Sequence, residues 1–244
     1  MTITALQIGE EILKGEKVLD LLAQYQMLPD FAKETIVNQA IANIECTPEE
    51  QNNAIAQFQQ QMQIASLEQL QVWLEQNGLT MEQLNLVTTR NLRLDKYKQQ
   101  AWGIKVDSYF MKRKSQLDKV IYSLIRTKDV GIAQELYFRV VGDEEPFAEL
   151  ARQYSEGNEA QTGGLIGPVE LNTPHPALAK ALKASQPGEV CAPMKVGEWY
   201  VIVKLEKFLS AQLDEQTRKR LLDELFNDWI EQTYRDQVSI HRAP

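Results

Sequence analysis

The chain of 244 residues contains few of the residues that build metal centres, disulfide scaffolds or membrane spans. It has two cysteines and two histidines. Four zinc ligands would need an unusual arrangement, and we expect neither a metal nor a cofactor. Cys46 and Cys191 are too few and too widely separated for a disulfide framework, so we expect two free thiols. Apolar runs are short, as at residues 199–203, and the sequence predicts no membrane insertion.

Basic residues are outnumbered by acidic ones. The chain has 26 Lys and Arg against 34 Asp and Glu, which gives a net charge of −8. A nucleic-acid-binding protein normally carries a basic domain, so we expect no nucleic-acid partner. Residues 1–17 show neither the basic n-region nor the apolar h-region of a secretory signal. On this pattern we expect a cytoplasmic location.

Helix signals dominate residues 1–118. Thr47, Ser66 and Thr80 are each followed three residues later by Glu or Gln, which is the pattern of a capping box at a helix start. Apolar residues recur at helical spacing between these signals, and β signals are sparse. The sequence therefore predicts an all-helical N-terminal domain of about five helices over residues 1–118.

Charge is uneven within this predicted domain. Residues 86–118 hold 8 basic and 3 acidic side chains, whereas residues 1–85 hold 3 basic and 12 acidic ones. The basic stretch is either an anion-binding face or a helix face that is solvated or complements an acidic neighbour. The second interpretation is the commoner one, and we favour it.

The residue pattern changes at residue 119. Residues 120–126 form a short segment that is rich in β-branched residues, which indicates a strand. Capping and turn residues then predict two helices, a short broken strand, a short helix and a hairpin of two strands, with signals at Asp129, Pro146, Gly167-Pro168, Pro176 and Gly197. The order βααβαββ predicts a small α+β domain over residues 119–207, with a four-stranded, mostly antiparallel sheet.

The C-terminal region, residues 208–244, contains one more predicted helix. Its wide apolar stripe is formed by Leu221, Leu222, Leu225, Phe226, Trp229 and Ile230. Because the α+β domain is complete without this helix, we expect the stripe to pack on the N-terminal domain. The predicted fold class is thus α+β: an all-helical N-terminal domain completed by a C-terminal helix, with the four-stranded domain inserted.

Four segments of the inserted domain resemble the parvulin domain, the PpiC-type rotamase module of peptidyl-prolyl cis-trans isomerases. They are residues 147–155 (FAELARQYS), 163–167 (GGLIG), 186–190 (QPGEV) and 199–205 (WYVIVKL), in the family's order and spacing. The helical domain closed by a C-terminal helix resembles SurA-type and PrsA-type chaperone foldases. The whole chain is similar to a cyanobacterial-type, leaderless form of that design.

The resemblance implies a catalyst of rotation about X–Pro bonds, with two histidines on neighbouring strands, a nearby Cys or Asp, and an apolar pocket for the proline ring. On this chain the two histidine positions are Ser123 and Val201, and the Cys or Asp position lies near Gly157, with Glu156 as the nearest carboxylate. The Met and Phe positions of the pocket are Pro174 and Leu178. Neither family histidine is kept, so no residue is assigned a catalytic role.

The resemblance also implies a peptide-binding groove. Its candidate residues are Ser123, Leu165, Pro174, His175, Leu178 and Val201. His175 matches neither catalytic position, and we interpret it as a loop histidine. Ser123 has no base placed beside it by a motif, so we interpret it as a strand serine rather than a nucleophile.

Three functions follow from this reading. The first is a peptidyl-prolyl isomerase or foldase with weak or lost isomerase activity and a peptide-binding chaperone role toward unfolded or proline-containing polypeptide segments. The alternatives are a fully active isomerase and a non-catalytic docking module for one dedicated partner. A fold does not decide among them, because function depends on the site.

Overall fold

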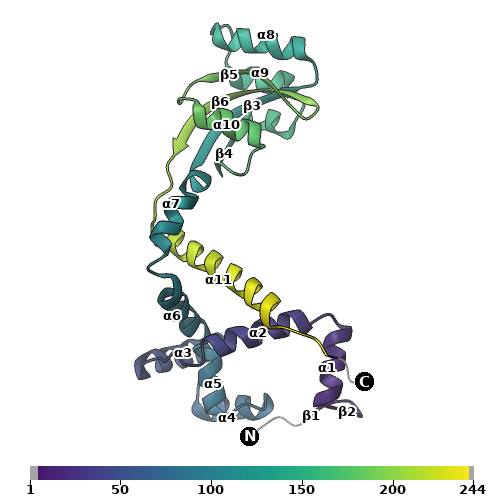
Figure 1. Ribbon diagram of the computed structural model, residues 1–244, viewed down its shortest axis with the longest axis vertical. Helices are drawn as coiled ribbons and strands as arrows, with labels where there is room; N and C mark the ends of the chain where they lie inside the picture. Colours follow the sequence, from purple (N-terminus) through teal and green to yellow (C-terminus); the bar gives the residue numbers. More distant parts are fainter. Residues whose placement is uncertain (1–4, 242–244) are drawn as a thin grey trace. The chain divides into compact units, whose positions relative to one another are not determined.

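The computed structural model describes residues 5–241, and the chain divides into two compact units (Figure 1). Unit 1 combines residues 1–106 with residues 218–244, and unit 2 consists of residues 107–217. Unit 2 is therefore inserted into unit 1, and two chain connections link them. The α+β fold class is confirmed.

Unit 1 begins with a two-stranded antiparallel hairpin, which corrects the prediction of an exclusively helical N-terminal region. Strands β1 (Ala5–Ile8) and β2 (Glu11–Lys14) pair around Gly9, whose φ is +61°. Glycine adopts this left-handed conformation without steric cost. Strands of four residues are too short to show a clear period of two in the sequence.

Helices form the rest of unit 1. They are α1 (Gly15–Gln24), α2 (Leu28–Ala40), α3 (Pro48–Gln61), α4 (Leu67–Gln76), α5 (Met81–Thr88), α6 (Arg90–Trp102) and most of α11 (Glu215–Gln237). Thr47 and Thr80 form the expected capping boxes at α3 and α5. Ser66 caps α4, but the Gln69 side chain accepts a hydrogen bond from the Ala65 N–H instead of closing the box.

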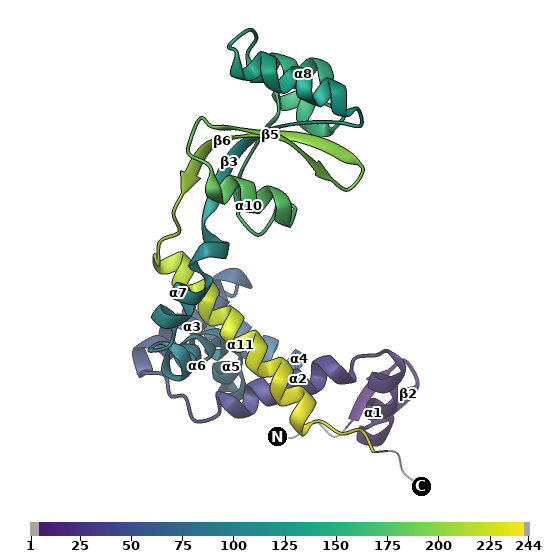
Figure 2. The same cartoon turned by 45° about the horizontal axis from the view of Figure 1, so that its top comes forward.

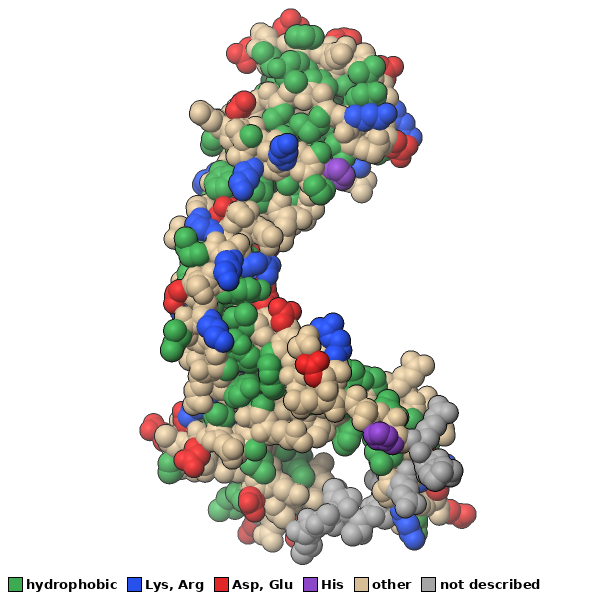
Figure 3. Space-filling model, viewed as in Figure 1, with side chains coloured by type: hydrophobic (Ala, Val, Ile, Leu, Met, Phe, Trp, Pro, Cys, Tyr) green, Lys and Arg blue, Asp and Glu red, His purple; other side chains and the backbone are tan. Residues whose placement is uncertain are grey.

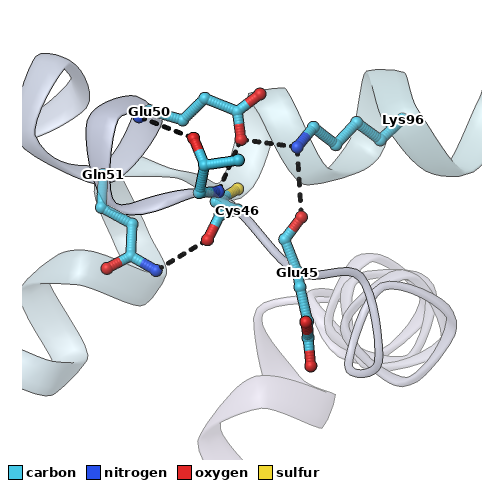
Figure 4. A network of polar contacts seen from close by, with 6 residues as sticks. Glu45, Cys46, Glu50, Gln51 and Lys96 are labelled. Carbon is cyan, nitrogen blue, oxygen red and sulfur yellow. Dashed lines mark hydrogen bonds and ion pairs between the residues drawn. The ribbon is translucent and has the colours of Figure 1, made fainter.

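A polar network links the α2–α3 loop to α6 (Figure 4). Lys96 Nζ donates to the Glu45 carbonyl at 3.1 Å and to Glu50 Oε2 at 2.6 Å. Glu50 Oε2 also accepts from the Thr47 N–H at 2.8 Å, so one carboxylate caps α3 and binds α6. The hydrogen bond from Lys96, and to a lesser extent the one from the Thr47 N–H, holds the pKa of Glu50 below its usual value.

Basic residues of the 86–118 stretch pair with acidic neighbours. Arg90 pairs with Glu34, Lys96 with Glu50, and Lys98 with Asp223. These ion pairs confirm, for the three residues, the interpretation of this face as complementary to acidic neighbours.

The C-terminal helix α11 packs on α6 through an aromatic cluster of Tyr97, Trp102, Phe226 and Trp229. Ring centroids across the two helices lie 5.6–6.4 Å apart. Most of these rings meet edge to face or tilted, which is the preferred geometry for aromatic pairs. Helix α11 therefore completes the N-terminal helical unit, as predicted.

Unit 2 contains one four-stranded sheet with strand order β4-β3-β6-β5, every pair antiparallel. The strands are β3 (Lys119–Thr127), β4 (Leu165–Glu170), β5 (Val190–Val196) and β6 (Trp199–Leu209), and the helices are α7 (Val106–Leu117), α8 (Val130–Val141), α9 (Phe147–Tyr154), α10 (Pro176–Ala184) and the 3-10 turn η1 (Asn158–Thr162). The predicted order βααβαββ is confirmed.

Helices α8, α9 and α10 of unit 2 divide between the two faces of the sheet (Figure 2). Helices α8 and α9 cover one face, with Ile125, Ile202 and Leu150 in the apolar cluster between them. Helix α10 covers the other face, where Leu178 packs with Val201 and Val203. Each face of the sheet has its own apolar cluster, so a sheet side chain points either toward α8 and α9 or toward α10.

Gly164 lies where η1 joins β4, close to the backbone of β3. Its φ is +83°, and a Cβ at this position would lie 2.7 Å from the Leu124 carbonyl oxygen. Gly163 also has a positive φ, of +65°. The Gly163-Gly164 pair is therefore a turn with a close backbone approach.

Both cysteines are free, with Cys46 in unit 1 and Cys191 in unit 2. Within residues 5–241, no helix combines the length and the apolar composition that crossing a bilayer requires.

Candidate functional site

Ser123 and Val201, which the sequence resemblance assigns to the family's two histidine positions, lie on opposite faces of the sheet. Ser123 pairs with Lys204 across β3 and β6, whereas Val201 pairs with Arg126. Because side chains alternate along a strand, Ser123 shares the α8–α9 face with Ile125, and Val201 shares the α10 face with Tyr122 and Leu124. The structure does not bring Ser123 and Val201 together.

The α10 face contains the two mapped positions that do meet. Leu178 from α10 and Val201 from β6 belong to one apolar cluster and are 7% and 3% exposed. Tyr122, from β3, is buried in the same cluster. Its burial, and to a lesser extent the negative charge of Glu159, raises the pKa of its phenol. The half-buried Trp199 packs against this cluster. Strands β3 and β6 contain no histidine, so this face carries no imidazole from them.

The space beside Gly157, near the family's Cys or Asp position, is occupied by an ion pair. A Cβ on Gly157 would lie 2.1 Å from Arg126 Nε and 2.2 Å from Glu159 Oε2. Arg126 Nε lies 3.1 Å from Glu159 Oε1, and the Arg126 guanidinium stacks over the Trp199 ring at 5.2 Å. An arginine and a carboxylate therefore occupy the space beside Gly157, the residue near which the resemblance expects a Cys or Asp.

Glu156, the nearest carboxylate in sequence, has a structural role. Its Oε1 accepts hydrogen bonds from the Lys128 N–H at 2.9 Å and from Thr127 Oγ1 at 2.8 Å. Both hydrogen bonds lower the pKa of Glu156, and the one from the Lys128 N–H has the larger effect. The carboxylate thus remains ionised near neutral pH and ties the loop after α9 to the end of β3.

The remaining groove candidates lie apart from this cluster. Leu165 begins the edge strand β4 and pairs with Ser123. Pro174 is half-buried, and the exposed His175 is the N-cap of α10, where its Nδ1 accepts from the Ala177 N–H at 3.2 Å. The structure therefore gives His175 a capping role, in keeping with the reading of a loop histidine.

Ser123 lines a pocket on the α8–α9 face. The pocket has a volume of about 770 Å³, and Ser123 lies at its floor with Lys204 and Glu206. Ser123 Oγ donates to Glu206 Oε1 at 2.7 Å, and Lys204 Nζ lies 3.3 Å from Glu206 Oε2. No sequence motif pointed to this trio, because its members come together only through the register of β3 and β6.

Unit 1 holds a second concave surface, a groove between α1, α2 and the end of α11. Its volume is about 1190 Å³, and half-exposed Leu19 and Phe31 line it together with Tyr234 and Ile240. An apolar groove of this size fits an extended stretch of several side chains. Among residues 5–241, no group of three His, Cys, Asp or Glu side chains is placed to hold a metal ion.

Comparisons with known proteins agree with this geometry. Residues 126–207 match the Rotamase family, described as the PPIC-type PPIASE domain. Chaperone SurA of Methylobacillus flagellatus is 38% identical over 93 residues, which are 34% of this chain and 21% of that protein. Chaperone SurA of Thiobacillus denitrificans is 35% identical over 107 residues, which are 40% of this chain and 24% of that protein. The matched part thus spans less than a quarter of these relatives.

A solved structure, peptidylprolyl isomerase PrsA from Bacillus cereus, is similar over 97% of this chain and 93% of its own, with a TM-score of 0.52 and 21% sequence identity. This likeness shows a shared fold. The four-stranded unit is thus a PPIC-type rotamase domain, and the resemblance to the parvulin domain is confirmed. In this chain the domain is inserted into a helical unit that its last helix closes, and over 97% of its length the chain shares the fold of that PrsA structure.

Proposed function

We propose that this protein is a parvulin-like foldase that binds unfolded or proline-containing polypeptide segments and has weak or lost isomerase activity. The observation that carries the proposal is the α10 face of the rotamase domain. Leu178 and Val201 meet there in a cluster that contains no histidine among the described residues, and Arg126 and Glu159 fill the space beside Gly157.

The loss of catalysis follows from what the reaction needs. Rotation about an X–Pro bond breaks amide resonance, with a barrier of about 18–20 kcal/mol. A polar network that favours the twisted amide lowers this barrier, and each 1.36 kcal/mol is about tenfold in rate. Tyr122 and Val201 offer no such network, because Tyr122 is buried and Val201 is apolar. A dry apolar surface alone leaves a small residual acceleration.

Peptide binding has two supports. The rotamase scaffold is intact, including the edge strand β4, which presents backbone groups for pairing with an extended peptide. Unit 1 adds the groove with Leu19 and Phe31, and exposed apolar surface of this extent commonly marks an interaction site. Both features suit segments without a fixed structure rather than one folded partner.

The test is a pair of measurements on one sample of the full chain: a protease-coupled isomerase assay with a panel of X-Pro peptides, and calorimetric binding of unfolded segments. We expect a rate far below that of a histidine-bearing parvulin, together with measurable binding. A rate comparable to that parvulin would establish a fully active isomerase instead. Failure to bind any unfolded segment would favour a docking module for one dedicated partner.

The chaperone role has its own control within unit 1. Phe31→Ser in the groove should reduce suppression of client aggregation, because it removes an exposed apolar contact. Ile104→Ser, at an equally apolar but 95% exposed site outside the groove, should leave it unchanged. We further propose a cytoplasmic location, to be checked by cell fractionation.

A further inference from the structure

The pocket that contains Ser123 lies on the sheet face opposite to Leu178 and Val201, the two mapped positions that meet. Its apolar walls come from α8 and α9, with Tyr137, Val140 and Phe147, and from Val190 of β5. Its volume of about 770 Å³ is in the range of pockets that hold a peptide side chain with its neighbours. Of the positions that the resemblance maps to catalysis or to the proline pocket, Ser123 alone lines this pocket, and it has no assigned catalytic role.

The floor of the pocket is polar and already satisfied. Ser123 is 5% exposed and donates to Glu206, whose second oxygen faces Lys204. A buried hydroxyl held in this way fixes the Glu206 carboxylate in place. The floor is therefore a preformed polar platform rather than a gap in the core.

The rim of the pocket continues into exposed apolar surface on α8. Phe138 is 67% exposed and Val141 is 55% exposed, one helical turn apart. Figure 3 shows hydrophobic side chains gathered around α8 with acidic side chains beside them. A partner that fills the pocket can thus cover these two side chains as well.

The charged side chains that line this pocket determine whether it favours a cationic or an anionic group. Asp143, Glu145 and Glu206 supply three carboxylates, and among the residues that the structure describes Lys204 is the one basic side chain that lines the pocket. Arg139 pairs with Glu145, and no ion pair is recorded for the exposed Asp143 within residues 5–241. The field at the mouth therefore favours a cation over an anion.

We propose that this pocket is a second peptide-binding site, which takes a Lys or Arg side chain while a neighbouring aromatic or aliphatic residue packs on Phe138 and Val141. A long basic side chain suits this site, because its alkyl stem lies along Val140 and Phe147 and its charged head reaches Asp143. The proposal rests on the proposed peptide-binding function and assigns it a substrate class and a place.

The experiment is a titration of the ¹⁵N-labelled full chain with a dodecapeptide that carries a Phe-Lys pair, followed by NMR. We expect amide shifts at α8, Val190 and Lys204. Phe138→Ser should weaken binding by about tenfold and Asp143→Asn by about threefold at low salt. Ile104→Ser and Glu198→Gln are matched controls outside the pocket, and both should leave the affinity unchanged. A peptide with Glu in place of Lys should not bind here.

Shifts confined to unit 1 or to the α10 face, with Phe138→Ser and Asp143→Asn binding as the parent, would overturn this proposal and leave the proposed function standing. Equal binding of the Glu peptide at α8 would overturn the choice of a cationic partner. The absence of shifts with every peptide would overturn both this site and the peptide-binding function.

Discussion

Ser123 and Val201 are on neighbouring strands, yet the sheet separates their side chains. Ser123 lines the pocket under α8 and α9, and Val201 is in the core under α10. We therefore predict that the double variant S123H/V201H will not gain isomerase activity, because its two imidazoles cannot interact through the sheet. NMR titration should give each histidine the same pKa in the double variant as in its single variant. Mutually shifted titrations or a gain in rate would contradict this geometry.

A side chain at Gly157 should disturb the Arg126–Glu159 pair. Gly157 has φ of −119°, so its conformation accepts any residue and only the occupied space opposes substitution. We predict that Gly157→Ala lowers the free energy of unfolding by roughly 1–3 kcal/mol, the usual range for overpacking.

The control for this prediction is Gly15→Ala, where a Cβ would meet nothing within 4 Å. In urea denaturation it should be neutral or slightly stabilising. In an Arg126→Ala background, Gly157→Ala should cost clearly less than in the parent. An equal cost in both backgrounds would show that Arg126 is not the obstacle.

The aromatic cluster between α6 and α11 should carry much of the stability of unit 1. Phe226 is buried among Tyr97, Trp102 and Trp229. We predict that Phe226→Ala lowers the free energy of unfolding of unit 1 by about 3–5 kcal/mol. Phe208→Ala, at a site 38% exposed in unit 2, should cost much less. Denaturant unfolding followed by tryptophan fluorescence would measure the free energy of unfolding of both variants. Equal losses of stability would contradict the claim that the aromatic cluster carries much of the stability of unit 1.

Glu50 should make unit 1 sensitive to acid. Lys96 and the Thr47 N–H stabilise the charged form, so the pKa of Glu50 is below its unfolded value of 4.5. The stabilisation is therefore fully present above that value and is lost as the pH falls through the lowered pKa. We predict that Glu50→Gln lowers the Tm at pH 7 and that the difference from the parent shrinks on acidification below pH 4.5.

The matched control is Glu49→Gln, one residue earlier in the first turn of α3. Its effect on the Tm should be smaller and should follow only the general helix-dipole interaction. A Tm difference for Glu50→Gln that stays constant down to pH 3 would contradict the role of the charged carboxylate.

Local signals in the sequence predicted most of the elements because their causes are local. Asp129 caps α8 through the Gly131 and Ile132 N–H groups, and Thr47 and Thr80 begin α3 and α5 as their capping boxes indicate. The apolar stripe of the last helix also predicted that this helix packs on the N-terminal helices, because the α+β domain is complete without it. The contact of Phe226 with Tyr97 agrees with this prediction. The hairpin at residues 5–14 was missed because two short strands give too little pattern.

The site was less predictable because it depends on register. The pairing of Ser123 with Lys204 involves residues 81 positions apart, and a bulge between Ile121 and Tyr122 shifts the ladder. A shift of one residue moves every side chain to the other face. Alternation along residues 120–126 could have grouped Ser123 with Ile125, but it could not show which face Val201 shares. Likewise, the Arg126–Glu159 pair beside Gly157 joins a strand to a turn that no motif marks.

The insertion of unit 2 also sets an order of events during protein synthesis. A ribosome releases the chain from its N-terminus, so Phe226 and Trp229 emerge after all of residues 107–217. The rotamase sheet can therefore close while Tyr97 and Trp102 still lack their partners on α11. Until the last helix arrives, the nascent protein combines a rotamase domain that can already fold with a helical unit that still lacks its last helix.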